Sequence, residues 1–219
     1  GSRIGETDWW GKPPYWRQAA EQKTIQVDID GDMLGLNKPA DLAILADAGR
    51  FLELLGDQLE RRKGEISLEG RRTRVAGYAK AMKDEREGWD KALSDMAIPM
   101  HPAHIAAVCR KVFPEDSVLV ADGGNATIWA MFYHQVNVPN TVLSTFKFGM
   151  LGAGMAQAVG AAVARPGKPV CCIIGDGAMG FHPQEIETAV RLQAQVIYIV
   201  LCDRQWGMVK MNQQFMLRP

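Results

Sequence analysis

The sequence has 219 residues, of which 47% are hydrophobic and 23% are charged, and its formal net charge at pH 7 is zero. These values are ordinary for a globular protein and allow one large domain or two small ones. A neutral chain has no charge excess that would attract nucleic acid or an anionic membrane, and no apolar run approaches the roughly 18 residues of a membrane-spanning helix. We therefore expect neither nucleic acid nor membrane as a partner.

The N-terminal part of the chain has the pattern of an α/β unit. Residues 25–29 and 43–45 are predicted strands, and residues 49–62 are a predicted amphipathic helix with a leucine-rich face. Residues 1–66 therefore form one predicted segment. Residues 67–98 are rich in charge and are predicted to form a linker helix.

A second α/β domain is expected over residues 99–219. Pro99 and Pro102 mark its boundary, and a helix at residues 101–112 is followed by a strand at residues 117–121. The four cysteines of the chain do not have the spacing of metal ligands, and three of them lie in predicted buried strands as small apolar groups. A reduced protein in the cytoplasm is the expectation.

The most informative pattern lies between residues 171 and 210. Residues 171–174 and 196–201 are apolar runs typical of parallel strands covered on both faces. Both strands of a parallel βαβ unit end at the same edge of the sheet, so Asp176 and Asp203 should project into one crevice. Two carboxylates beside glycines suit a divalent cation such as Mg²⁺ that also holds a phosphate.

These residues also resemble a known family. Gly175-Asp176-Gly177, an acid at position 203 and Gly207-Met208-Val209 resemble the cofactor signature of thiamine-diphosphate enzymes, in particular the acetolactate synthase and benzaldehyde lyase branch. Residues 122–125 and 148–164 resemble two further segments of that family. The resemblance covers nearly the whole chain. It implies Rossmann-like, three-layer α/β domains with parallel sheets and helices on both faces, the thiamine-diphosphate-binding fold. Residues 1–66 would then be the C-terminal part of a central domain, and residues 99–219 a truncated diphosphate-binding domain.

The resemblance also implies a metal site. Its ligands would be Asp176, Asp203 and the backbone carbonyl of Gln205. The family usually has Asn at position 203, and Asp places the same ligating oxygen there. The additional negative charge strengthens the attraction for Mg²⁺ and repels the diphosphate.

Residues at the cofactor are implied in the same way. They come from the two glycine turns, the segment before the small-residue helix and the segment after residue 207: Gly124, Asn125, Gly149, Leu151, Gly175, Gly177, Ala178, Met179, Met208 and Val209. Gly124 and Asn125 would meet the diphosphate, and Leu151 would hold the cofactor in its bent form. Met208 and Val209 would flank the thiazolium ring.

For three residues near these turns, a structural role is an alternative to a role in ligand binding. Asp122 is expected to accept hydrogen bonds from turn amides. Asn125, near a helix start, is equally an N-cap. For His182 we favour a structural role over a place at the mouth of the site.

The function implied is that of a thiamine-diphosphate- and Mg²⁺-dependent enzyme that decarboxylates or ligates 2-oxo acids or aldehydes. In the family an activating Glu lies in a separate pyrimidine-binding domain, usually of the other subunit, and no segment here resembles that domain. We therefore expect a piece of a longer homodimeric or homotetrameric enzyme, inactive alone. Asn212, where acetolactate synthases carry Trp, and residues 3–7, where they carry an Arg-rich FAD run, argue against strict acetolactate synthase activity and against FAD.

An alternative class is a non-catalytic nucleotide-binding or interaction module of Rossmann-like fold. Such a module would need a GxGxxG turn after a strand. Residues 149–154 contain three glycines but not at that spacing, which argues against this class.

Overall fold

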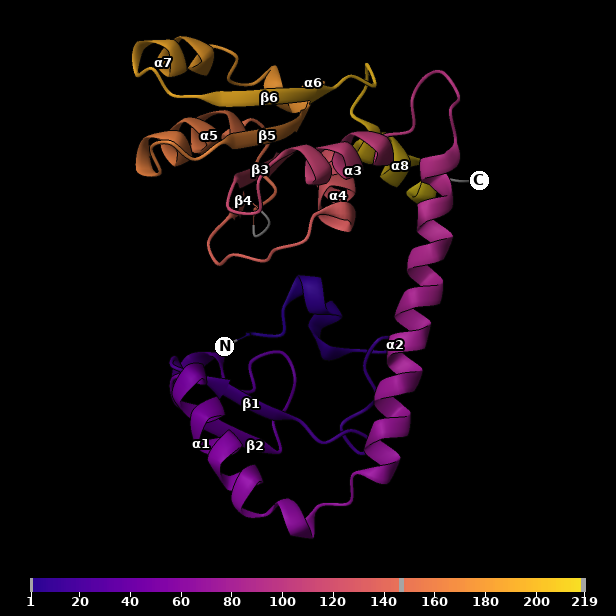
Figure 1. Cartoon of the computed structure of the whole chain (residues 1–219). Helices are drawn as coiled ribbons and strands as arrows, with labels where there is room; N and C mark the ends of the chain where they lie inside the picture. The colour runs from indigo at the N-terminus through magenta and orange to yellow at the C-terminus, as the bar shows by residue number, and fades with distance from the viewer. Residues whose placement is uncertain (1, 146–147, 218–219) are drawn as a thin grey trace. The chain divides into compact units, whose positions relative to one another are not determined.

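The structure, a computed structural model, describes residues 2–145 and 148–217 apart from the side chains of Glu6, Thr7 and Trp9 (Figure 1). The chain forms two compact units, residues 1–80 and 81–219, and the division falls within a long helix. Each unit has its own parallel sheet.

The N-terminal unit is built on a small two-stranded sheet. Strands β1 (Ile25–Asp28) and β2 (Leu42–Leu45) pair in parallel, and α1 (Ala48–Arg61) follows β2. The Asp47 carboxylate accepts a hydrogen bond from the Arg50 amide and caps α1. The long helix α2 (Glu69–Asp90) comes next. Short 3₁₀ helices cover Glu6–Gly11, Gly31–Met33, Lys63–Glu65 and Lys91–Ser94. In the part of the chain that the structure describes, no helix combines the length and the apolar character needed to cross a membrane.

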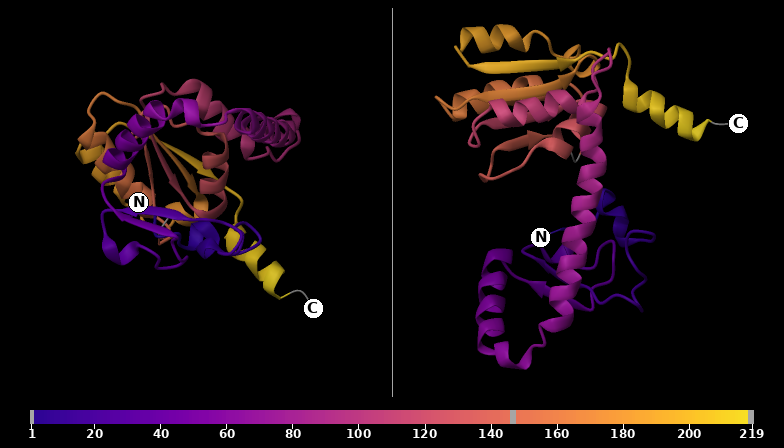
Figure 2. Two further views of the ribbon diagram at one scale, coloured as in Figure 1. Left: turned by 90° about the horizontal axis from the view of Figure 1, so that it is seen from below. Right: turned by 45° about the vertical axis from the view of Figure 1, so that its right-hand side comes forward.

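The C-terminal unit has a four-stranded parallel sheet in the order β4-β3-β5-β6. Its elements are α3 (Ala103–Val112), β3 (Val118–Asp122), α4 (Gly124–Tyr133), β4 (Val142–Ser144), α5 (Ala153–Ala164), β5 (Val170–Gly175), α6 (Asp176–Met179), α7 (Glu185–Arg191), β6 (Val196–Leu201) and α8 (Gly207–Met216). Helix α8 runs away from the sheet (Figure 2). The sequence did not predict β4 or α8.

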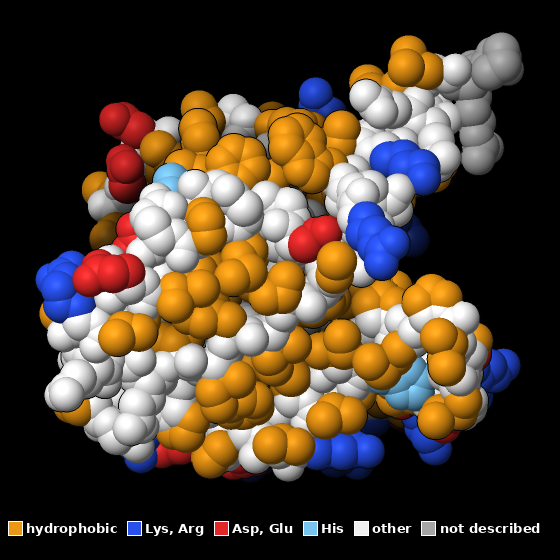
Figure 3. Space-filling model, turned by 90° about the horizontal axis from the view of Figure 1, so that it is seen from above, with side chains coloured by type: hydrophobic (Ala, Val, Ile, Leu, Met, Phe, Trp, Pro, Cys, Tyr) orange, Lys and Arg blue, Asp and Glu red, His pale blue; other side chains and the backbone are white. Residues whose placement is uncertain are grey.

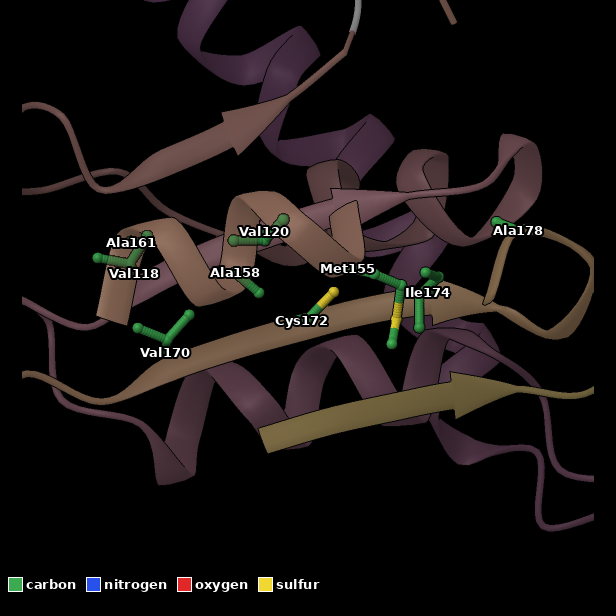
Figure 4. Close-up of a cluster of buried hydrophobic side chains, with 9 residues drawn as sticks. All are labelled: Val118, Val120, Met155, Ala158, Ala161, Val170, Cys172, Ile174 and Ala178. Atoms are coloured by element: carbon green, nitrogen blue, oxygen red, sulfur yellow. The ribbon is translucent and has the colours of Figure 1, made fainter. Parts of the chain in front are cut away.

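Helices cover both faces of this sheet, as the sequence predicts. Side chains of β3 and β5 alternate between two buried clusters because successive residues of a strand point to opposite faces. One cluster packs Met155 and Ala158 of α5 against Cys172 and Ile174 of β5 (Figure 4). The other cluster packs α3 and α4 against the opposite face. The unit is therefore a three-layer α/β domain.

One strand is less covered than its sequence indicates. The apolar run of β6 predicts a strand buried on both faces, but β6 lies at the edge of the sheet. The side chains of Ile197 and Val200 are 52% and 38% exposed, so this prediction is wrong for β6. Apolar side chains are gathered on the face seen in Figure 3, which looks onto this edge. Strand β5 lies between β3 and β6, and its prediction as a buried strand is confirmed.

The connections create a switch point between two neighbouring strands. The chain leaves β3 through α4 to reach β4 on one side, and it returns through α5 to reach β5 on the other side of β3. The carboxyl ends of β3 and β5 therefore diverge into helices on opposite faces. Open α/β sheets bind their ligands at such a point.

A buried carboxylate holds this switch point together. Asp122, at the end of β3, is only 3% exposed. Its Oδ1 accepts a hydrogen bond of 2.6 Å from the Gly123 amide, and its Oδ2 accepts one of 2.7 Å from the Gly154 amide in the first turn of α5. A Cβ on Gly154 would lie 2.6 Å from the Asp122 Cβ, so only glycine allows this approach. The expectation that Asp122 serves backbone amides is confirmed.

Replacing this carboxylate should destabilise the unit. In Asp122→Ala two amides lose their acceptor, the Gly154 amide in a buried position, so we expect the free energy of unfolding to fall by about 2–4 kcal/mol. Asp122→Asn should lose less, because the amide oxygen still accepts one bond. Chemical denaturation followed by circular dichroism measures both. Asp116→Ala, which removes a surface ion pair with Lys168, is the control and should change stability little. Equal losses in Asp122→Ala and Asp116→Ala would contradict this account.

Candidate functional site

Three loops meet at the carboxyl edge of the C-terminal sheet. They are the turn from β3 into α4 at residues 122–125, the turn from β5 into α6 at residues 175–178, and the connection from β6 to α8 at residues 202–207. The first two loops are in close contact. A Cβ on Gly123, whose φ is +89°, would lie 3.1 Å from the backbone nitrogen of Gly175. Glycine is required at position 123 both for that backbone conformation and for the close approach.

The third loop approaches the first equally closely. A Cβ on Gly124 would lie 2.6 Å from the Cβ of Met208, so Met208 packs directly on the start of α4. A Cβ on Gly207 would lie 2.5 Å from Asp203 Oδ2 and 2.7 Å from Asn125 Nδ2. The Asn125 amide and the Asp203 carboxylate therefore face the same backbone carbon, and the sequence-predicted residues of the two loops are brought together.

Asp176 connects the second loop to the third. Its Oδ1 accepts a hydrogen bond of 2.9 Å from the Gly177 amide, and its Oδ2 accepts one of 3.1 Å from the Arg204 amide. The Cys202 thiol lies 3.5 Å from the same Oδ2. Asp176 is thus bonded to the residue that follows Asp203. The two predicted carboxylates lie at one edge of the sheet, as the parallel βαβ pattern requires.

The loop that carries Asp203 has a constrained backbone. Arg204 has a φ of +58°, a left-handed conformation that is uncommon for a residue with a side chain. Asp203 Oδ1 accepts a hydrogen bond of 3.1 Å from the Gln205 amide, and Lys210 Nζ donates one of 2.8 Å to Gln205 Oε1. Strained residues of this kind cluster at functional sites, where surrounding contacts hold them.

The donor set at this edge suits a hard cation. Within the described residues, no three His, Cys, Asp or Glu side chains form a group that could hold a metal. The predicted site needs only two carboxylates, Asp176 and Asp203, with the carbonyl of Gln205 as a third oxygen. Mg²⁺ commonly binds through one or two carboxylates and leaves its other positions to phosphate and water. A carboxylate oxygen that accepts one backbone hydrogen bond retains a second lone pair. The residues therefore fit the metal.

The start of α4 suits an anion. Helix α4 begins at Gly124, directly after the switch point, and its N-cap is Gly123. Asn125 lies within the first turn and its side chain makes no capping hydrogen bond, so the N-cap interpretation of Asn125 is wrong. Its amide is directed instead toward the backbone of residue 207. A helix N-terminus attracts phosphate through its unpaired amides and the helix dipole.

The remaining predicted cofactor residues differ in their surroundings. Ala178 is buried on the α5 side of the sheet, and Leu151 and Met179 pack against the same cluster. Gly149 and Val209 are exposed, so the structure leaves them at the surface. His182 pairs its Nδ1 with Gln184 Nε2 at 3.4 Å just before α7, a contact consistent with the structural role we favour for it.

Sequence reasoning missed an aromatic pair beside the glycine turn. A Cβ on Gly177 would lie 2.6 Å from Cδ1 of Trp206, so the indole rests on the backbone of that turn. The Trp206 ring also stacks on Phe181, with centroids 6.2 Å apart and planes inclined by 28°. The position of Trp206 between the predicted ligand Gln205 and the glycine at 207 was the available signal.

Comparison with known proteins identifies the family. Residues 122–218 match the thiamine pyrophosphate enzymes at their C-terminal TPP binding domain. Residues 122–218 therefore form a C-terminal TPP binding domain of the thiamine pyrophosphate enzymes. Thiamine pyrophosphate is the same compound as thiamine diphosphate, so the family resemblance of the sequence is confirmed.

Individual thiamine pyrophosphate enzymes match over most of the chain. Sulfoacetaldehyde acetyltransferase from Castellaniella defragrans is 29% identical over 213 residues, which are 91% of this chain and 35% of the relative. A probable acetolactate synthase large subunit from Methanococcus aeolicus is 26% identical over 197 residues, 87% of this chain and 33% of the relative. The chain thus spans about a third of the length of these curated relatives.

A solved structure agrees with the fold. The crystal structure of benzoylformate decarboxylase from Polynucleobacter necessarius is similar to this chain with a TM-score of 0.52 and 27% identity. The similarity covers 56% of this chain and 24% of that chain. The predicted fold class, parallel sheets with helices on both faces, is therefore confirmed by the structure and by this similarity.

The contact at Gly207 provides a test of the site geometry. In Gly207→Ala the new methyl group would displace both Asp203 and Asn125, so we expect affinity for thiamine diphosphate, measured by calorimetry with Mg²⁺, to fall by at least about tenfold, or 1.4 kcal/mol. Gly180→Ala is the matched control, because its Cβ would meet only ordinary contacts of 3.5 and 3.6 Å. An unchanged affinity in Gly207→Ala would show that this approach does not shape the site.

Proposed function

We propose that this chain forms the diphosphate- and Mg²⁺-binding half of a thiamine pyrophosphate enzyme that decarboxylates or ligates 2-oxo acids. The observation that carries the proposal is the hydrogen bond of 3.1 Å between Asp176 and the Arg204 amide, which joins the glycine turn to the Asp203 loop at the switch point. Similarity to benzoylformate decarboxylase and to a probable acetolactate synthase supports the substrate class, because benzoylformate is a 2-oxo acid.

In this proposal the three loops have separate tasks. Asp176, Asp203 and the carbonyl of Gln205 would hold Mg²⁺, whose charge would offset that of the diphosphate. The Asn125 amide and the start of α4 bind the diphosphate oxygens. The contacts of Asp176 with two backbone amides hold it in place before the metal arrives, so little ordering is needed on binding.

Apolar side chains would surround the rest of the cofactor. Met208 packs on Gly124 beside the diphosphate region, and Leu151 packs against the core on the α5 side. These side chains would keep water from two sides of the cofactor, which would strengthen electrostatic interactions inside the site. The bound cofactor supplies the electron sink for cleavage of the bond to the carboxylate.

The proposal assigns no catalytic residue to this chain. The acid that activates the cofactor is placed in a separate domain, usually of a second subunit, so a homodimer or homotetramer is part of the proposal. The substrate is a small 2-oxo acid or aldehyde, and a cytoplasmic location stays a prediction. The argument against FAD rests on residues 3–7, which include Glu6 and Thr7, whose side chains lie outside the described residues.

Removing the central carboxylate tests the metal assignment. We expect Asp176→Ala to lose Mg²⁺-dependent binding of thiamine diphosphate, because the cation loses a ligand and the Asp203 loop loses its anchor. Stability should change little, since water can reach the Arg204 amide. Calorimetry with and without Mg²⁺ measures the effect. Glu187→Ala, an exposed acid of α7, is the control. Equal affinities in Asp176→Ala and Glu187→Ala would refute the site.

The acid at position 203 allows a subtler experiment. Asp203→Asn keeps a ligating oxygen and removes one negative charge, so we expect Mg²⁺-dependent binding to persist. Mg²⁺ affinity should weaken a few-fold, and diphosphate affinity at saturating Mg²⁺ should not fall, because a repulsive charge is gone. Asp203→Ala removes the ligand altogether and should abolish the dependence on Mg²⁺. If Asp203→Asn also abolished the dependence of binding on Mg²⁺, Asp203 would have a role other than ligation.

A further inference from the structure

A second group of reactive side chains lines a small cavity on the α3 and α4 side of the C-terminal sheet. Cys109 of α3 and Cys171 of β5 both face this cavity, together with Arg110 and His134. Cys171 is the second residue of β5, whereas Asp176 follows the other end of that strand. The cavity therefore shares no residue with the carboxyl edge.

The two cysteines belong to the same packed cluster and line the same cavity. Cys171 is 2% exposed within the buried cluster, and the half-buried Cys109 packs against that cluster from α3. Hydrogen bonding with Cys171 lowers the pKa of Cys109, whereas the same interaction, followed by burial, raises the pKa of Cys171. Of the pair, Cys109 is the one that ionises first and is the nucleophile.

A cation with a free donor lies beside them. The Nε of Arg110 is buried and has no hydrogen-bond partner among the described residues. The same guanidinium donates to Gln135 Oε1 at 3.2 Å and lies 3.7 Å from Glu115 Oε1. Burial, followed by the charge of Arg110, lowers the pKa of His134, so His134 is neutral near pH 7. Arg110 is thus the positive group that lines the cavity.

We propose that Cys109 and Cys171 form an oxidisable thiol pair whose oxidant is hydrogen peroxide. The Cys109 thiolate attacks one peroxide oxygen and the O–O bond breaks. Cys109 becomes a sulfenic acid, and the departing oxygen leaves as water after taking the proton that Cys109 had released. The Cys171 thiol then attacks the sulfenic sulfur, a disulfide forms and a second water is released. The peroxide is reduced by two electrons, and the two thiols are oxidised by two.

The neighbouring cysteine provides a matched control. Cys172 lies on the same strand but faces α5, and its thiol contacts the Gly154 carbonyl at 3.7 Å. Burial, followed by the charge of Asp122, raises its pKa to about 12. Cys172 is therefore as buried as Cys171 but has neither the partner thiol nor the cavity. The exposed Cys202 reports the general reactivity of a cysteine with peroxide in the same molecule.

The test is peroxide oxidation of the full chain followed by peptide mapping. The reduced protein is treated with stoichiometric hydrogen peroxide, free thiols are blocked by alkylation, and a digest is searched by mass spectrometry for a Cys109–Cys171 linked peptide. We expect this linkage, with the loss of two hydrogens, in the wild type and in Cys172→Ala, and its reversal by a thiol reductant. Cys109→Ser should lose the linkage. Cys171→Ala should stop at a Cys109 sulfenic acid that dimedone traps.

Several results would overturn the proposal. Oxidation of Cys109 in the wild type without linkage to Cys171 would mean that the two thiols do not act as a pair. Oxidation confined to Cys202, or none at all, would mean that the cavity does not promote the reaction. If Cys171→Ala fails to fold, linkage in the wild type and its loss in the half-buried Cys109→Ser decide the question.

Discussion

The buried Asp122 carboxylate is the constraint on which the carboxyl edge of the sheet depends. Its two oxygens accept hydrogen bonds from the Gly123 amide, in the turn that leaves β3, and from the Gly154 amide, in the first turn of the helix α5 that leads back to β5. Because the end of β3 is fixed to the start of α5, the backbone of Gly123 lies in close contact with the backbone of Gly175. The glycine turn after β5 thereby acquires a fixed position. The Asp203 loop is then attached to that turn through Asp176.

At this edge, glycine backbone lies in close contact with neighbouring segments of the chain. Side chains occupy the space that a Cβ would need at Gly124, Gly177 and Gly207, so each of these glycines is where another part of the molecule comes closest. Such packing leaves amides and carbonyls within reach of a ligand. It also brings two acids and an amide, Asp176, Asp203 and Asn125, to the edge of the sheet where we propose that a cation and a diphosphate bind together. Two carboxylates repel a diphosphate unless a metal lies between them, so binding of metal and of diphosphate should be coupled.

Patterns that follow from local chemistry could be predicted from the sequence. The apolar run of β5 and the glycine turn after it were recognised, because a strand buried on both faces needs only apolar residues and a turn needs glycine. Features that depend on tertiary contacts were not. The three residues of β4 are too few to form a pattern, and the exposure of β6 depends on its place at the sheet edge. The N-cap role of Asn125 was excluded only once Gly123 was seen to occupy that position.

The most direct test of the account is to locate the metal. Crystals of the protein grown with thiamine diphosphate and Mn²⁺ in place of Mg²⁺ would show the cation through its anomalous scattering. The account predicts a single strong peak beside the carboxylates of Asp176 and Asp203, with the diphosphate between that peak and the start of α4. A peak elsewhere, or a bound diphosphate with no metal at these two carboxylates, would contradict the central claim that the switch-point edge of this sheet is the cofactor site.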